Sequence, residues 1–187
     1  MAVTISETTI RDVLEVHSQI FRDERGYFTE IYNAKAWAEA GFEHTFVQDN
    51  LSVSARGTLR GLHYQLDPDG QGKLVCALRG SVFDVAVDIR EGSPTFGNWV
   101  GRTLSEGSGL ALWVPQGFAH GFLVLEDDTQ VLYKCTHFYM PEAERTIVYN
   151  DPDIGIEWPF EPTEIKDRDA QAPGLHEAER NFSYASQ

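Results

Sequence analysis

Residues 82–89 read VFDVAVDI, and from Phe83 onward large apolar residues alternate with aspartate or alanine. In an extended chain, successive side chains point to opposite faces, so the large apolar residues share one face and the two aspartates share the other. The first face carries Phe83, Val85, Val87 and Ile89, and the second carries Asp84, Ala86 and Asp88. This pattern predicts a half-buried β-strand.

The surrounding sequence predicts further short strands. Residues 74–78 form another apolar run, and the turn-forming residues 79–81 separate it from the first, so we expect the two runs to form a hairpin. Similar apolar runs occupy residues 110–114, 121–125 and 131–138. One helix is predicted over residues 34–40, where Asn33 can cap its start and Gly41 can end it.

Many short strands separated by turns indicate an all-β protein, in which each sheet buries its apolar face against another. We therefore expect an antiparallel sandwich or jelly-roll barrel with a few short helices. The 187 residues fit one domain spanning 1–187, without internal repeats or a linker. The more polar stretch at about 159–187 is expected to wrap the barrel as loops and helical turns.

The charge balance limits the choice of partners. The chain carries 15 Lys and Arg against 29 Asp and Glu, a net charge of -14, which repels nucleic acids and acidic membrane surfaces. A small anion remains possible, because a few cations in a cleft can hold it. Without a basic and apolar leader or an apolar run of about 20 residues, the sequence predicts a cytoplasmic protein.

The first candidate site cluster reads LRGLHYQ at residues 59–65 and QGKLV at residues 71–75. It brings Arg60, His63 and Lys73 close together in a chain that is poor in positive charge. A single histidine in a β protein is more often structural than catalytic. With two cations beside it, however, the cluster indicates a pocket for an anionic substrate.

The second cluster reads WVPQGFAHGFLVLED at residues 113–127 and contains His120, which could equally be a satisfied histidine at a barrel corner. In the third, VLYKCTHFY at residues 131–139, the even spacing of Tyr133, His137 and Tyr139 places them on one strand face. That face could line the barrel mouth or be a wet outer surface, and periodicity does not separate the two.

Metal-binding spacing is absent from the sequence. The histidines are isolated from one another, and the two cysteines, Cys76 and Cys135, lie in apolar runs where cysteine behaves as a small core residue. We therefore expect neither a metal centre nor a disulfide.

Taken together, these segments resemble the dTDP-4-dehydrorhamnose 3,5-epimerase family of the cupin superfamily. The resemblance extends over roughly residues 3–175 and keeps the order of several long motifs. Besides the clusters above, the matching segments are DERGYFTE at 23–30, FVQDNLS at 46–52, FDVAVDIR at 83–90, LYKCTHFY at 132–139 and NDPDIGIEWP at 150–159.

The resemblance implies a cofactor-free isomerase that inverts C3 and C5 of dTDP-4-dehydro-6-deoxy-D-glucose through an enolate, giving dTDP-4-dehydro-L-rhamnose. His63 matches the base and Tyr133 the acid on the opposite face, while Lys73 matches the cation beside the C4 oxygen. The carboxylate partner of His63 aligns with Asp169. Because Lys166 stands where the family usually has serine, Asp167 is a rival for that role.

The resemblance also implies a set of residues that bind the sugar nucleotide, and a homodimer whose N-terminal strand is exchanged. The exchanged segment supplies Arg25, Phe28 and Glu30, and the remaining binding residues are Gln48, Asn50, Arg60, His120, Tyr139 and Glu144. Three alternatives stay open: an epimerase acting at C3 or C5 alone, a metal-dependent cupin enzyme, and a noncatalytic carbohydrate-binding barrel.

Overall fold

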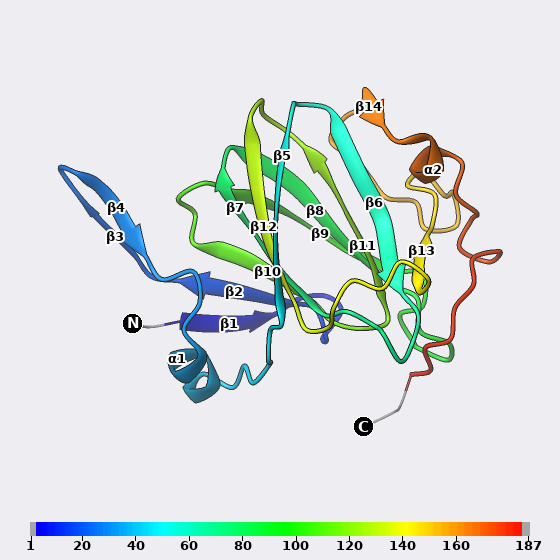
Figure 1. Cartoon of the computed structure of the whole chain (residues 1–187), viewed down its shortest axis with the longest axis horizontal. Coiled ribbons are helices and arrows are strands. Elements are labelled where there is room, and N and C mark those ends of the chain that lie inside the picture. Colours follow the sequence, from blue (N-terminus) through cyan, green and yellow to red (C-terminus); the bar gives the residue numbers. More distant parts are fainter. Residues whose placement is uncertain (1–2, 185–187) are drawn as a thin grey trace.

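The computed structural model describes residues 3–184, most of whose strands form two sheets that lie against each other as a barrel (Figure 1). The first sheet has the order β1 (Val3–Glu7), β2 (Leu14–Ser18), β10 (Leu110–Val114), β7 (Lys73–Arg79), β12 (Thr129–Cys135), β5 (Gln48–Ser54). The second has the order β13 (Glu144–Thr146), β6 (Thr58–Gln65), β11 (Phe118–Val124), β8 (Ser81–Asp88), β9 (Trp99–Ser105), with β14 (Glu164–Ile165) parallel to β6.

The remaining elements are short. A hairpin of β3 (Ile20–Asp23) and β4 (Gly26–Thr29) projects from the barrel as an arm, on the opposite side of the view from β14 (Figure 1). The helices are α1 (Ala34–Glu39) and α2 (Asp167–Ala170). Within residues 3–184, no helix is long and apolar enough to cross a membrane. The predicted all-β jelly-roll barrel with short helices is confirmed.

Three apolar clusters hold these layers together. The central one fills the space between the sheets and includes Val75 and Val131 from the first sheet and Val82 and Phe122 from the second. A second cluster lies under the C-terminal segment, where Leu175 contributes. The third lies under α1, against the other side of the first sheet. Both sheets are therefore covered on their outer sides over part of their area, as well as inside the barrel.

The predicted hairpin of residues 74–78 with residues 82–89 is wrong. β7 pairs with β10 and β12, whereas β8 pairs with β9 and β11, so the turn between them passes from one sheet to the other. Gly80 makes this corner with a φ of +67°, and a Cβ there would lie 2.3 Å from the Thr129 hydroxyl oxygen. The turn signal was correct, but a local signal does not specify which strands pair.

The prediction that residues 82–89 are half buried is also wrong, because both faces of β8 are covered. Val85, on the first face, packs under the C-terminal segment. The face that carries Asp84 and Asp88 turns into the barrel instead, and both aspartates are 0% exposed. The C-terminal segment thus covers the apolar face, and the acidic face lies toward the barrel interior.

Two other predictions were local and had different outcomes. Helix α1 begins where expected, since the Asn33 side chain accepts a hydrogen bond from the Ala36 N–H, and Gly41 follows its end with a φ of +90°. The strand predicted over 131–138 ends instead at Cys135. His137 and Tyr139 therefore lie in a loop beyond β12, and do not share a strand face with Tyr133.

Strands β6 and β11 approach unusually closely at a pair of glycines. A Cβ added to Gly61, whose φ is +129°, would lie 2.5 Å from the Gly121 Cα atom. This close approach lies between two cross-strand pairs, one of His63 with His120 and one of Arg60 with Phe122. Two glycines at this crossing let both histidines stand side by side on the inner face of the sheet.

Replacing Gly61 by alanine should therefore destabilise the fold by about 3 kcal/mol, from backbone strain and from the overlap with Gly121. Chemical denaturation of the Gly61→Ala variant measures this loss. Gly92 is the matched control, because its φ is +77° but nothing lies within 4 Å of an added Cβ. Gly92→Ala should lose only about 1 kcal/mol. Equal losses in both variants would contradict the role of the close approach.

Candidate active site

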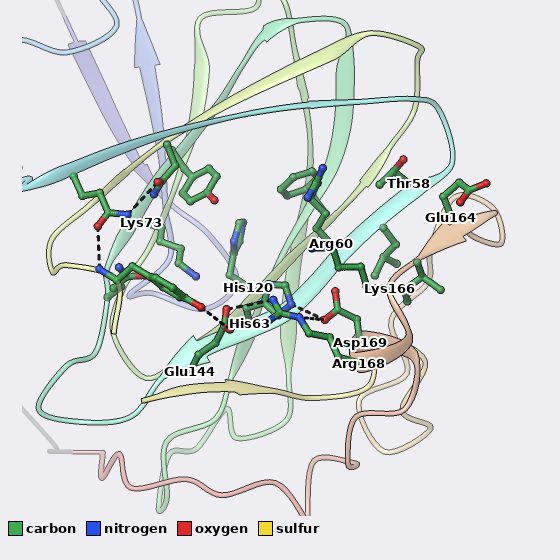
Figure 2. A pocket seen from close by; sticks show the side chains of 18 residues that line it. Thr58, Arg60, His63, Lys73, His120, Glu144, Glu164, Lys166, Arg168 and Asp169 are labelled. Carbon is green, nitrogen blue, oxygen red and sulfur yellow. Dashed lines mark hydrogen bonds and ion pairs between the residues drawn. The ribbon is translucent and has the colours of Figure 1, made fainter. Parts of the chain in front are cut away.

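A cavity of about 620 Å³ opens between the two sheets and is lined by residues from both (Figure 2). Strands β6 and β11 supply one wall, strands β5, β7 and β12 the facing wall, and β13, β14 and α2 one rim. The predicted site residues that line it are Gln48, Asn50, Arg60, His63, Lys73, His120, Tyr133, Tyr139, Glu144 and Asp169. Residues more than 100 positions apart are thus brought into one chamber.

His63 and Asp169 form a dyad on the β6 side of the cavity. Nε2 of His63 lies 2.9 Å from Oδ1 of Asp169, which is 2% exposed. Burial raises the pKa of Asp169, but the hydrogen bond and charge of His63, helped by the Gly61 N–H and Arg168, hold it below its ordinary value. An ionised carboxylate only accepts hydrogen bonds, so Nε2 carries the proton and Nδ1 keeps the lone pair. Asp167 does not line the cavity.

Lys73 and Tyr133 come from the facing sheet. Lys73 is 9% exposed, and burial lowers the pKa of its ammonium group. Tyr133 is half-buried, and burial raises the pKa of its phenol, which keeps the hydroxyl protonated at neutral pH. The cavity therefore has the imidazole of His63 on one wall and the proton-donating phenol of Tyr133 on the other. The ammonium group of Lys73 belongs to β7, which pairs with the strand of Tyr133, β12.

One end of the cavity is organised by amide side chains. The backbone N–H of Tyr139 donates to Oε1 of Gln48 at 2.9 Å, and Nε2 of Gln48 donates to Oδ1 of Asn50 at 3.0 Å. Gln65 holds the same loop, since its Oε1 accepts from the Met140 N–H at 2.9 Å. The loop after β12 is thus fixed so that the exposed Tyr139 ring stands at the rim.

Arg60 and a second histidine, His120, also line the cavity. Arg60 donates to the Ser54 hydroxyl at 3.1 and 3.2 Å and forms no ion pair with a carboxylate of residues 3–184. His120 is 6% exposed, and its Nε2 lies 2.8 Å from Oδ1 of Asp84. An arginine without a protein carboxylate is suited to bind phosphate oxygens of a ligand.

The sequence prediction did not select Arg168 or Asp84, two charged residues that contact predicted site residues. Arg168 lies beside the dyad, with Nη1 2.9 Å from Oε2 of Glu144 and Nε 3.3 Å from Oδ1 of Asp169 (Figure 2). The same Glu144 oxygen accepts from the Tyr139 hydroxyl at 3.0 Å. Arg168 adjoins Asp169 in the sequence, which was the available signal. Asp84 is the other, and its signal was its place on the acidic face of β8.

Other sequence candidates lie outside the cavity of this chain. Arg25, Phe28 and Glu30 belong to the arm or follow it, and none lines the cavity. His137 is also outside, with Nε2 3.8 Å from Oδ1 of Asp69. Among residues 3–184, no group of three or more His, Cys, Asp or Glu side chains is arranged to hold a metal ion. The two cysteines are free thiols.

Residues 7–177 match the model of the family described as dTDP-4-dehydrorhamnose 3,5-epimerase. The chain belongs to this family. A dTDP-4-dehydrorhamnose 3,5-epimerase from Pseudomonas aeruginosa is 53% identical over 167 residues, which cover 87% of this chain and 92% of that protein. The resemblance that the motifs indicated is therefore confirmed, and with it the isomerase class.

Solved structures of relatives extend the likeness to the whole epimerase fold. The 3,5-epimerase from Legionella pneumophila in complex with dTDP-4-keto-L-rhamnose has a TM-score of 0.89 and 48% identity, covering 94% of each chain. A 3'-monoepimerase from Streptomyces bikiniensis in complex with dTDP-quinovose has a TM-score of 0.85 and 36% identity, covering 91% of this chain and 87% of that one. Single-position and double epimerases thus share this fold.

Proposed function

We propose that this chain epimerises C3 and C5 of dTDP-4-dehydro-6-deoxy-D-glucose and yields dTDP-4-dehydro-L-rhamnose. The observation that carries the proposal is the placement of the His63–Asp169 dyad and Tyr133 on facing sheets of one cavity, with Lys73 beside them. The name of the Pseudomonas aeruginosa relative and the ligand of the Legionella pneumophila structure support the substrate assignment.

The first step is removal of a proton next to the C4 ketone. Nδ1 of His63 takes the proton from C5 or C3, and the electrons of the broken C–H bond form a C=C bond while the carbonyl oxygen becomes an enolate. An imidazole suits this step because its pKa lies close to neutral pH. Asp169 orients the ring through Nε2 and stabilises the imidazolium that forms.

Lys73 stabilises the enolate oxygen. A fixed positive charge in a buried site interacts more strongly with a full oxyanion than with a neutral ketone, so it lowers the barrier for the step. The 9% exposure of Lys73 reduces screening of that charge by water. The same enolate oxygen serves both carbons, because C3 and C5 both flank C4.

Inversion is completed by the phenol of Tyr133, which gives its proton to the ring face opposite His63. The resulting phenolate and imidazolium return to their starting states by proton exchange with water. The configuration of one carbon is inverted, and repetition at the second carbon gives the product. No net oxidation or reduction takes place, so the sequence of steps uses no redox cofactor.

Product analysis by NMR tests the function and separates it from the single-position alternative. The purified protein should convert dTDP-4-dehydro-6-deoxy-D-glucose to the L-rhamno product, with both C3 and C5 inverted. A product inverted at only one carbon would establish the mono-epimerase that the Streptomyces bikiniensis relative exemplifies. Tight binding without any change of the sugar would support a noncatalytic binding barrel.

We further propose that the chain works as a homodimer in which the arm completes the partner's cavity. The arm exposes Phe28 (62%) and Tyr27 (41%), and the outer face of β5 exposes Leu51 (58%) and Val53 (56%). Exposed apolar side chains that neighbour one another, as Leu51 and Val53 do on one face of β5, are typical of a protein interface. The arm lies on the opposite side of the view from β14 and α2 (Figure 1), which border the cavity, so we expect Arg25, Phe28 and Glu30 to bind nucleotide in another copy.

Mixing two inactive variants tests the exchange. Arg25→Ala/Phe28→Ala damages only the arm, whereas His63→Ala damages only the cavity. Co-expressed dimers should regain activity, because an undamaged cavity then meets an undamaged arm, while each variant alone remains impaired. Activity that never exceeds the sum of the separate variants, or a particle of one chain's mass (21.0 kDa) by light scattering, would contradict the proposal.

A further inference from the structure

Gln65 is a buried amide side chain at the end of β6 that lies outside the cavity. It is 3% exposed and is not among the residues that line the cavity. Its Nε2 donates to the carbonyl oxygens of Asp69 at 2.6 Å and Phe138 at 3.1 Å, and its Oε1 accepts from the Met140 N–H at 2.9 Å. A buried carboxamide whose donors and acceptor are paired with the backbone of two loops fixes those loops relative to the sheet.

Two of these hydrogen bonds enclose a single residue, Tyr139. The Phe138 carbonyl belongs to the peptide group that precedes Tyr139, and the Met140 N–H belongs to the peptide group that follows it. The N–H of Tyr139 itself donates to Oε1 of Gln48 at 2.9 Å. Gln48 comes from β5 of the first sheet and Gln65 from β6 of the second, so the backbone of Tyr139 is held between the two sheets.

The side chain of Tyr139 is the part of this loop that reaches the cavity. It lines the cavity, and its hydroxyl donates to Oε2 of Glu144 at 3.0 Å. The flanking residues Phe138 and Met140 are exposed, as Tyr139 is, so little apolar burial supports the loop. The position of the loop therefore depends on the hydrogen bonds of its backbone.

We propose that Gln65 is a positioning residue that holds the Tyr139 ring at the cavity rim in the orientation that binds the sugar nucleotide. The inference rests on the proposed function, in which Tyr139 is a binding residue. A loop that must be ordered when the ligand binds costs part of the binding free energy, and a loop that is already ordered avoids this cost. Gln65 thus contributes to affinity and not to the chemical step.

Gln65→Met removes these hydrogen bonds and keeps a side chain of similar length. The amides of Tyr139 and Met140 should then exchange with solvent about tenfold faster, which NMR measures in the free protein. The affinity for dTDP-glucose should fall by about tenfold, because the loop must be ordered on binding. This ligand lacks the C4 ketone and cannot form an enolate, so calorimetry reports its binding alone. The kcat for the ketosugar should stay within about twofold.

A second substitution distinguishes positioning of Tyr139 from a general structural role. In a chain that already carries Tyr139→Ala, adding Gln65→Met should change the affinity by less than about twofold, because the ring that Gln65 holds is missing. Asn181→Ala is the matched control. The Asn181 carboxamide also binds a loop through both its ends, to the N–H and the carbonyl oxygen of Asp67 at 2.9 and 2.8 Å, and does not line the cavity. Its replacement should leave the affinity unchanged.

If Gln65→Met does not fold, Gln65→Asn provides the same test, because its carboxamide ends one methylene short of the loop. Unchanged exchange of the loop amides, or normal affinity despite faster exchange, would overturn the proposal. A loss of affinity that is equally large in the Tyr139→Ala background would also overturn it. Weakened binding of dTDP-glucose by Gln65→Met, when the unmodified protein binds this ligand but does not epimerise the ketosugar, would overturn only the proposed function.

Discussion

His63→Ala should lose about 10³-fold in the rate of deuterium exchange at both C3 and C5 of the ketosugar, as expected when a general base is removed. One imidazole serves both carbons, so exchange at the two positions should fall together. The affinity for dTDP should stay within about threefold, because His63 is not among the residues proposed to bind the nucleotide. Proton NMR in deuterium oxide measures the exchange, and calorimetry measures the affinity.

A surface histidine provides the control for this change. His176 is 65% exposed in its side chain and lies outside the cavity, 3.6 Å from a carboxylate oxygen of Asp153. His176→Ala should exchange both protons at the rate of the unmodified protein. Exchange at a normal rate in His63→Ala would refute the assignment of the base, and loss at only one carbon would require a separate base for the other.

Tyr133→Phe should separate the two halves of the reaction. Loss of the phenol removes the acid from one ring face, so formation of the inverted product should fall by about 10³-fold. Proton abstraction by His63 should fall much less, because the dyad and Lys73 are intact. Deuterium carried by the imidazolium can then return to the face it left, giving labelled sugar of unchanged configuration.

The contrast between exchange and inversion is what identifies the acid. Tyr184→Phe is the control, because Tyr184 does not line the cavity. Its ring packs against Arg90, whose guanidinium carbon lies 5.0 Å from the ring centroid. It should neither slow exchange nor change the product. Equal losses of exchange and inversion in Tyr133→Phe would contradict the division of labour between Tyr133 and His63.

Local sequence signals predicted elements better than they predicted pairing. The cap at Asn33 and the glycine after α1 depend on neighbouring residues only, and both were confirmed. The partners of β7 and β8 depend on strands far away in the chain, and the expected hairpin was wrong. Likewise, alternation in residues 82–89 identified two faces, but only the C-terminal segment determines that the apolar one lies outside the barrel.

The candidate site shows the same division. Motif resemblance brought residues as distant as Gln48 and Asp169 into one prediction, and the structure places them around one cavity, although their roles stay predictions. Arg168 contacts Glu144 and Asp169, and Asp84 contacts His120. The resemblance implied no role for either residue, so the sequence offered little reason to select them. The arm residues remain a prediction that depends on a second copy of the chain.

Incubation of the unmodified protein with dTDP-4-dehydro-6-deoxy-D-glucose in deuterium oxide tests most directly whether base and acid act from opposite walls. The mechanism predicts a single product that carries deuterium at both C3 and C5, each with inverted configuration. Inversion with the original hydrogen retained at either carbon, or deuterium at neither, would contradict the account.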